Sequence, residues 1–363
     1  MRVLTVNPGS SSLKLSLLDD GALVTGANLA TGAGTREGER LAAAIARMPA
    51  PDAVGIRIVH GGRAFREPVA VDDEVIKRLY SLVELAPLHL PLSLYVLGEL
   101  RRALAHLPMV ACFDTAFHAN LPEAAATYAL PAEWRERFGL RRYGFHGLSH
   151  SYATRRAGEL LGTDPAMLRI VVCHLGSGAS LAAVANGCSV DTTMGFTPLD
   201  GLVMATRSGG IDPGIPLWLV RTGLPHGEIM DALEHRSGLR ALAGTGDMRQ
   251  IRIRADQGDT VANAALDVYH HRLRASAAAM TASLGGLDAL VFTGGVGEND
   301  PALRQRLAED LAFLGVTLNH DRNATARSDA EISAAGAQVR TVVITAREDL
   351  EIAAGVRHAL DTR

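Results

Sequence analysis

The chain has 363 residues, of which 47% are apolar and 21% are charged, and its formal net charge is −3. This length allows two domains with filled cores, and the composition excludes a long disordered part. The slightly acidic charge gives no reason to expect nucleic acid or membrane partners, and no run of about 18 apolar residues suggests a membrane helix. Three cysteines without CxxC spacing favour a soluble protein in a reducing cytoplasm.

The first apolar stretch of the chain, RVLTVNPGSSSLKLSLLD at 2–19, recurs in the second half as RIVVCHLGSGASLAAVANG at 169–187. Each copy is an apolar run, a Gly/Ser turn and a second run that alternates with period two, which predicts a β-hairpin. Small residues and unpaired N–H groups in such turns bind anions, most often phosphate. The repetition predicts a duplicated fold that binds a polyphosphate between its halves.

The first half of the chain predicts alternating helices and strands. In order these are a connection of little character over 21–38, a helix over 40–48, a strand over 53–60, a helix over 72–86, a loop over 87–91, a helix over 92–105 and a strand over 109–113. The two strands end among polar groups, with Arg57 and His60 on the first and Asp114 and His118 after the second. Open α/β sheets bind ligands at such strand ends.

The second half continues this pattern around one unusual segment. It comprises a proline-punctuated helical stretch over 121–140, a turn over 141–150 that opens a helix, an irregular segment over 191–216, a helix over 262–284, a strand over 287–292, a tight turn over 293–297, a helix capped at 298–301 that runs to 314, a strand over 339–345 and a closing helix over 347–360. Residues 191–216 are too rich in Gly, Pro and Thr for regular structure and too apolar for a solvated loop. Long irregular segments in compact domains are usually functional.

Three alternative sites are poorly supported. A P-loop needs a Gly-Lys pair, which this sequence lacks. TGGVG at 293–297 lacks the spacing of a dinucleotide-binding fingerprint. His146 and His150 have zinc-ligand spacing, but no third ligand is evident. A phosphate-binding site without a Walker loop remains.

Eight successive segments resemble the motifs of the acetate kinase family, in the family's order and over nearly the whole chain. They are NPGSSSLK, RIVHGG, FDTAFH, YGFHGLSH, HLGSG, MGFTPLDGLVMATRSG, FTGGVGEN and REDLEIA. The resemblance implies an α/β protein of two duplicated domains like those of actin, Hsp70 and sugar kinases, with the nucleotide in an interdomain cleft. Domain I then comprises 1–118 and 350–363, and domain II comprises 119–349. It also implies reversible phosphoryl transfer from ATP to acetate, Mg²⁺ with Mn²⁺ as a substitute, and a homodimer formed through the second domain.

The resemblance also implies residue roles. Asp114, His146 and Arg207 are the implied catalytic residues, Arg57 the ligand of the acetate carboxylate, and Asn7 and Glu348 the metal site. The implied pocket for the acetate methyl group consists of Val59, Leu88, Phe145 and Pro198. The implied nucleotide-binding residues are Lys14, His174, Leu175, Gly176, Ser177, Gly178, Asp247, Met248, Arg249, Gly295, Val296, Gly297, Glu298 and Asn299.

The chemistry of the implied reaction favours cations over a general base. Acetate is already ionised at neutral pH, so it needs no deprotonation to attack. The obstacle is the repulsion between an anionic oxygen and an anionic γ-phosphate, which arginines, a histidine and Mg²⁺ can offset. We therefore interpret Asp114 as a positioning and metal-shell group.

Several positions differ from the family pattern. Ser177 stands where the phosphate loop usually has Asn, Met248 where an aromatic residue is usual, and Leu90 in place of an Asn. Arg347 and Asp349 replace an Asn and a Glu beside Glu348. Propionate or butyrate kinase, pyrophosphate-dependent acetate kinase, and a nucleotide-driven binding module of the actin/Hsp70 type are therefore kept as alternatives.

Overall fold

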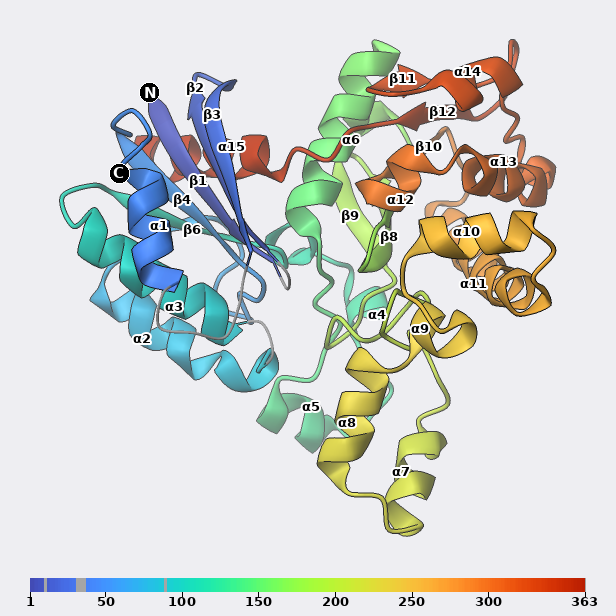
Figure 1. The fold of residues 1–363 in the computed structure, drawn as a ribbon, viewed down its shortest axis with the longest axis horizontal. Helices are drawn as coiled ribbons and strands as arrows, with labels where there is room; N and C mark the ends of the chain where they lie inside the picture. The colour runs from blue at the N-terminus through green and yellow to red at the C-terminus, as the bar shows by residue number, and fades with distance from the viewer. Residues whose placement is uncertain (10–11, 31–36, 88–89, 363) are drawn as a thin grey trace. The chain divides into compact units, whose positions relative to one another are not determined.

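The computed structural model describes residues 1–9, 12–30, 37–87 and 90–362, and they form two compact units (Figure 1). The first unit comprises Met1–Ala119, Phe145–Tyr152 and Arg347–Arg363, and the second comprises Asn120–Gly144 and Ala153–Ala346. Besides residues 119 and 347–349, the sequence-based division assigns residues 145–152 to the second domain instead. They group with the first unit because Gly147 N–H donates to the Asp114 carbonyl at 2.8 Å and the His118 ring bonds to the Phe145 carbonyl at 3.1 Å.

Each unit contains a six-stranded mixed sheet, and the two sheets have the same topology. The first sheet has the order β3-β2-β1-β4-β6-β5, with β1 (Arg2–Pro8), β2 (Ser12–Asp19), β3 (Ala22–Ala30), β4 (Ala53–Ile58), β5 (Val69–Ala70) and β6 (Met109–Phe113). The second has the order β9-β8-β7-β10-β12-β11, with β7 (Ile170–Leu175), β8 (Ala179–Ala185), β9 (Cys188–Thr192), β10 (Ala289–Thr293), β11 (Ala330–Glu331) and β12 (Arg340–Val343). In both orders, the first three strands pair antiparallel with one another, and the third, fourth and fifth strands pair parallel. The sixth strand pairs antiparallel with the fifth at the edge of the sheet. The predicted duplication and both predicted hairpins are confirmed.

Helices cover both faces of the first sheet. They are α1 (Glu37–Ile45), α2 (Asp73–Ser81), α3 (Leu90–Ala103) and α15 (Glu348–Asp361), with short 3₁₀ turns at Val83–Leu85 and Ala116–His118. Because side chains alternate along a strand, Leu4 and Val6 of β1 pack with α1, α2 and α3, while Val3 packs with Ile352 and Val356 of α15. Figure 1 shows α15 and the group α1 to α3 on opposite faces of this sheet.

The prediction of a featureless connection over 21–38 was wrong for the described part of that segment. Residues 22–30 form β3, which pairs antiparallel with β2. Its Gly, Ala and Asn residues have weak strand propensity, so pairing with β2 decides the conformation. The helix expected over 72–86 is α2 alone: Asp72 caps it by accepting from Val75 N–H at 2.8 Å, and the chain then continues as a 3₁₀ turn.

The second unit is richer in helices. They are α4 (Glu123–Ala126), α5 (Ala132–Phe138), α7 (Gly214–Arg221), α8 (His226–His235), α9 (Gly238–Ala243), α10 (Met248–Asp256), α11 (Thr260–Leu284), α12 (Gly294–Asn299), α13 (Pro301–Asp310) and α14 (His320–Thr325), while α6 (Gly147–Leu161) begins in the first unit and continues into the second. The long helix α11 packs against β7, β8 and β9 and is flanked by α9, α10 and α13.

The prediction of a tight turn over 293–297 was wrong, because residues 294–299 form α12. Three glycines make this helix intrinsically weak. It is held by the fully buried Arg304, whose Nη1 donates to the carbonyl oxygens of Gly297 and Glu298, each at 2.8 Å. A guanidinium on the following helix α13 therefore satisfies carbonyls at the C-terminal end of α12, which the residues of α12 alone do not reveal.

Gly55 allows α15 to approach β4 closely. A Cβ atom at this position would lie 2.5 Å from Ile352 Cγ2 and 2.6 Å from Val356 Cγ2. We expect Gly55→Ala to destabilise the first unit by about 1–3 kcal/mol through overpacking, measured by urea unfolding. The control is Gly98→Ala in α3, where a Cβ atom would meet nothing within 4 Å. This variant should gain roughly 0.5–1 kcal/mol from the lower chain entropy, and equal stability of the two variants would contradict the packing.

Candidate active site

A buried ion pair lies where two parallel strands of the first sheet end. Arg57 is near the end of β4 and Asp114 directly follows β6, so the parallel pairing of these strands brings the two side chains together. Arg57 Nε donates to Asp114 Oδ1 at 2.9 Å and Nη2 donates to Oδ2 at 2.5 Å. Asp114 is 1% exposed and the side chain of Arg57 is 14% exposed. The pair is bidentate and largely removed from water.

Asn7 and Glu348 extend this pair into a network. Arg57 Nη1 donates to Asn7 Oδ1 at 3.1 Å and to the Pro8 carbonyl at 3.3 Å. Asn7 Nδ2 in turn donates to Glu348 Oε2 at 2.6 Å, at the first residue of α15. The structure therefore brings together the residues predicted for metal binding, carboxylate binding and catalysis in the first unit.

The electrostatics of the pair follow from its burial. Burial opposes the charge of Arg57, but Asp114 and Glu348 outweigh it and raise the pKa of this guanidinium. Burial raises the pKa of Asp114, whereas Arg57 and the backbone N–H of His146 stabilise the charged carboxylate. A carboxylate whose two oxygens already accept from Arg57 is poorly placed to remove a proton.

His146 has an unusual backbone beside this network. Its φ angle is +57°, in the left-handed region that few residues other than glycine adopt. The next residue, Gly147, leaves no space for a side chain, since a Cβ atom would lie 2.1 Å from the Asp114 carbonyl oxygen. Such strain persists only where the surroundings impose it, and it concentrates at functional sites.

Two more histidines are buried around Phe145. His60 Nδ1 accepts from Gly62 N–H at 2.9 Å and its ring contacts the Phe145 ring edge-on at 5.4 Å. His118 Nε2 lies 3.1 Å from the Phe145 carbonyl, which can only accept, so this nitrogen carries the proton. Burial lowers the pKa of both histidines to about 4, so they are neutral at pH 7. They order the chain before His146 as structural groups.

Three of the four residues predicted to surround the acetate methyl group lie within the described part of the chain, and all three are buried. Val59 is 7% exposed and Phe145 is 1% exposed, both in the first unit. Pro198 is buried in the second unit. Leu88 lies outside the described residues, so its predicted role stays a prediction.

The second hairpin turn and α12 lie side by side in the second unit. Gly294 has a φ angle of +78°, and a Cβ atom there would lie 2.7 Å from the Leu175 carbonyl oxygen. Parallel pairing of β10 with β7 sets Thr293 opposite His174. The turn at 176–178 is closed by a 3.0 Å bond from Gly176 N–H to the Gly178 carbonyl. Two glycine-rich segments with exposed residues therefore meet at one edge of the sheet.

Other residues predicted to bind the nucleotide lie close to the turn at 176–178 through backbone contacts. The Ser177 carbonyl accepts from Ala205 N–H at 3.1 Å, and a Cβ atom at Gly246 would lie 2.9 Å from the Ala205 carbonyl oxygen. Asp247 follows and caps α10, while Met248 is buried and Arg249 is exposed. Of the remaining predicted residues, Gly297 is buried, Val296 and Glu298 are partly buried, and Gly295, Asn299 and Lys14 are exposed.

Arg207 is held within the irregular segment. Its Nη1 donates to the Pro198 carbonyl at 2.6 Å, which joins two predicted site residues directly. Burial lowers the pKa of Arg207, and the nearby Glu234 opposes that shift. Even a lowered value leaves a guanidinium charged at neutral pH, so Arg207 offers a desolvated positive charge.

Comparison with known proteins identifies the family. The model of the acetokinase family matches residues 40–354. The chain belongs to this family.

Individual relatives agree with the assignment. An acetate kinase from Trichormus variabilis is 48% identical over 319 residues, which covers 87% of this chain and 78% of that protein. The crystal structure of Porphyromonas gingivalis acetate kinase superposes with a TM-score of 0.90 at 33% identity, covering 99% of each chain. A propionate kinase structure from Francisella tularensis gives a TM-score of 0.89 at 33% identity and covers 98% of each chain.

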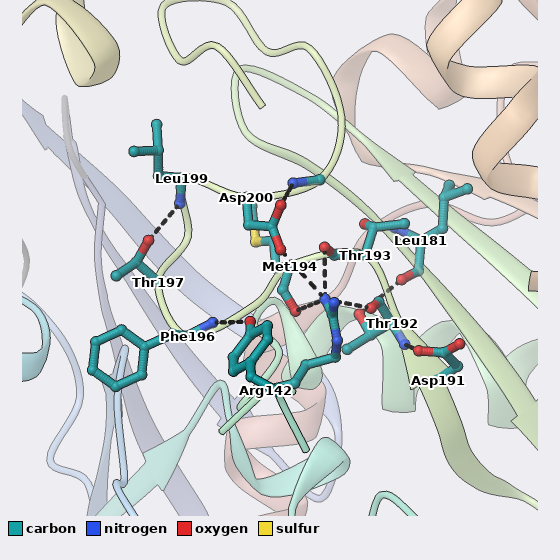
Figure 2. Close-up of polar contacts among 12 residues, drawn as sticks. Arg142, Leu181, Asp191, Thr192, Thr193, Met194, Phe196, Thr197, Leu199 and Asp200 are labelled. Atoms are coloured by element: carbon teal, nitrogen blue, oxygen red, sulfur yellow. Dashed lines mark hydrogen bonds and ion pairs between the residues drawn. The ribbon is translucent and has the colours of Figure 1, made fainter. Parts of the chain in front are cut away.

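Arg142 organises the irregular segment of this acetokinase-family chain, and we did not predict it from the sequence. Figure 2 shows its guanidinium facing the backbone that follows β9. Nη1 lies 3.0 Å from the carbonyl oxygens of Thr192, Thr193 and Met194, and 3.6 Å from Asp200 Oδ2. The only sequence signal was its place in the RRYGFHGLSH turn.

Tyr128 supports Arg142 from the other side. The guanidinium carbon of Arg142 lies 5.7 Å from the centre of the Tyr128 ring, and the Tyr128 hydroxyl accepts from Phe196 N–H at 2.9 Å. The backbone leading to Pro198 and Arg207 is therefore held by side chains from a different part of the second unit.

We expect Arg142→Lys to loosen this segment, because one ammonium group cannot replace a planar guanidinium that serves three carbonyls and a carboxylate. Hydrogen–deuterium exchange over 193–201 should rise, and the turnover number of phosphoryl transfer should fall roughly 10- to 100-fold because Arg207 is displaced. The control is Arg137→Lys, an exposed arginine of α5. Unchanged exchange in Arg142→Lys would show that the segment is ordered without it.

Proposed function

We propose that this chain is an acetate kinase, which transfers the γ-phosphoryl group of ATP reversibly to acetate and yields acetyl phosphate and ADP. The observation that carries the proposal is the match of the acetokinase family model to residues 40–354. The 48% identity to an acetate kinase supports it, as does the Arg57–Asp114–Asn7–Glu348 network. These residues are the ones that an anionic substrate and a metal-bound nucleotide require.

In this proposal Arg57 attracts the acetate carboxylate mainly through its charge. The contacts among described residues engage four of its five N–H groups: two with Asp114, one with Asn7 and one with Pro8. One N–H on Nη2 remains to donate directly to acetate. The Asp114 pair holds the guanidinium rigidly, so little reorganisation accompanies substrate binding.

His146 and Arg207 then stabilise the phosphoryl group as it transfers. Acetate attacks the γ-phosphorus directly, the bond to the ADP oxygen breaks, and no proton has to move at acetate. Negative charge spreads over the phosphoryl oxygens in the transition state, where preorganised cations are most effective. The desolvated Arg207 fits this role.

The first unit contains a donor set that fits Mg²⁺. Mg²⁺ in such sites is held by one or two carboxylates, with water and substrate phosphates completing the shell. Glu348 and Asp114 provide the carboxylates, and Asn7 orients Glu348 through its 2.6 Å bond. The neighbouring pair of Arg347 and Asp349, joined by two 2.9 Å bonds, leaves the start of α15 ordered despite the changed residues. When bound, Mg²⁺, or Mn²⁺ in its place, neutralises charge on the ATP phosphates.

The second unit is assigned to ATP. The turn at 176–178 and the start of α12 bring glycine-rich backbone to one edge of the sheet, and such backbone suits phosphate oxygens. Ser177 is exposed and its carbonyl is held by Ala205, so its hydroxyl is available at the turn surface. Pyrophosphate is the alternative phosphoryl donor that has to be distinguished from ATP, because Ser177 lacks the side-chain amide that the family usually has in this phosphate loop.

We further propose a cytoplasmic homodimer that associates through the second unit. Within the described residues, no helix is long and apolar enough to cross a membrane. Helix α7 exposes Ile215, Leu217, Trp218 and Val220, with Leu217 68% and Trp218 61% exposed. An apolar group of this kind favours contact with another protein surface, here a second copy. Sedimentation velocity measures the oligomeric state.

The direct test is an acyl hydroxamate assay with acetate, propionate or butyrate, each with ATP or pyrophosphate. We expect ATP and acetate to give the highest kcat/KM. Arg207→Ala should lower kcat by about 100-fold or more with little change in the KM for ATP, because its charge acts on the transition state. The exposed Arg236→Ala is the control. A change in KM alone would remove Arg207 from the catalytic group.

The choice between acetate and propionate is tested at Val59. Removing two methyl groups from this buried residue should enlarge the pocket and raise kcat/KM for propionate relative to acetate, within about 1–3 kcal/mol. The matched control is Val110→Ala in β6, a buried valine that packs in the core under α15. It should lower stability and leave the substrate ratio unchanged. A flat acyl-chain profile in Val59→Ala would place Val59 in the core rather than the pocket.

A further inference from the structure

A cavity of about 260 Å³ lies between α11 and α13, within the second unit and outside the residues assigned to catalysis. It is lined by Asp267, His270, His271, Arg274, Arg306 and Asp310. The four α11 residues follow the i, i+3, i+4, i+7 spacing that places side chains on one helix face, and the two α13 residues are one turn apart. Charged and titratable side chains of both helices therefore converge on one space.

His270 is the buried member of this group. It is 1% exposed, and neither ring nitrogen has a hydrogen-bond partner among the residues that the structure describes. A neutral imidazole carries one N–H donor and one acceptor nitrogen, and buried polar groups normally have partners. A ligand in the cavity that His270 lines can supply the missing partner.

The cavity offers more hydrogen-bond donors than acceptors. Arg306 Nη2 donates to Asp267 at 2.7 Å, and Arg274 Nη1 lies 3.5 Å from Asp310 while Nη2 lies 3.3 Å from His271 Nδ1. Each guanidinium has five N–H groups, and both carboxylates already accept from an arginine. The described residues contain no group of three His, Cys, Asp or Glu that could hold a metal ion. The complementary ligand is rich in acceptors.

We infer that this cavity binds a small oxyanion, a phosphoryl or carboxylate group, and that binding adds a proton to His270. The two arginines and two aspartates that line the cavity balance in formal charge when the histidines are neutral, so a bound anion introduces uncompensated charge. Protonation of His270 beside the anion neutralises part of it and provides a second N–H donor.

The surroundings keep His270 neutral while the cavity lacks an anion. Burial, then the positive charges of Arg306 on α13 and Arg252 on α10, lower the pKa of His270 to about 4, against the opposing effect of Asp300 and Asp310. His271 and Arg274 also face the cavity from α11. An oxyanion beside the ring reverses the sign of the local field and favours the imidazolium.

Histidine NMR tests this inference on the intact protein. The ¹³Cε1 signal of His270 is assigned through the backbone of α11 and checked with His270→Asn, and it is followed from about pH 8 to about pH 5. Inorganic phosphate and succinate are added in separate arms. Without either anion the signal should stay that of a neutral ring. With the anion that fits, the pKa of His270 should rise by about one to three units, the range that a nearby opposite charge produces.

Arg306→Gln distinguishes this cavity from other anion sites, because its guanidinium is partly exposed and its loss should leave the fold intact. The Arg306→Gln variant should abolish the anion-induced rise in the pKa of His270. Arg236→Gln, which removes an exposed arginine paired with Asp231 at 2.7 Å, should preserve it. A response to phosphate alone assigns a phosphoryl ligand, and a response to succinate alone assigns a carboxylate. No shift with either anion, or a shift that persists in Arg306→Gln, overturns the inference, and neither result bears on acetyl phosphate formation.

Discussion

The bidentate pair of Arg57 and Asp114 is the constraint on which the first unit depends. It joins the ends of β4 and β6, and through Asn7 and Glu348 it also reaches β1 and α15. Removing two charges from water is unfavourable, so such a pair persists only where geometry is good and the remaining donors are satisfied. Here the geometry is bidentate, and contacts among the described residues engage four of the five N–H groups of Arg57. The pair serves orientation more than stability, because it holds one guanidinium at a fixed place and leaves one N–H without a contact among the described residues.

The two units share one sheet topology but carry different residues at the corresponding strand ends. In the first sheet, the parallel strand ends carry charged side chains, Arg57 and Asp114. In the second, the corresponding edge carries glycine-rich backbone, where the turn at 176–178 meets α12. Anionic carboxylates are attracted by fixed cations, whereas phosphate oxygens are well served by backbone donors. Under the proposed function, the same topology serves substrate recognition in the first unit and phosphate binding in the second, and the two differ in composition rather than architecture.

Arginine organises the polar interior of both units. Arg57 and Arg142 each bring together segments distant in the chain, and Arg304 joins α13 to α12, by donating to carboxylates or backbone carbonyls. A planar guanidinium with five N–H groups can satisfy several acceptors at once, which an ammonium group cannot do in the same geometry. The chain has only two lysines, Lys14 and Lys77, so nearly all of its positive charge is available in this form. Irregular backbone such as 192–200 is ordered by these contacts rather than by its own hydrogen-bond ladder.

The sequence alone determined the duplication, both hairpins, most strands and helices, and the residue types at the strand ends, because hydrophobic periodicity and glycine turns act locally. Strand ends and a family resemblance also predicted Asn7, Arg57, Asp114 and Glu348 as site residues, and these four side chains form one hydrogen-bonded network. Tertiary structure alone decided that residues 22–30 form a strand, since only pairing with β2 orders such a weak sequence. It likewise decided that Arg142 holds the segment before Arg207 and that Arg304 stabilises α12. The contacts of Arg142 link residues 50–52 positions apart, and those of Arg304 link α13 to the helix before it. No local pattern specifies which carbonyl a buried guanidinium will meet.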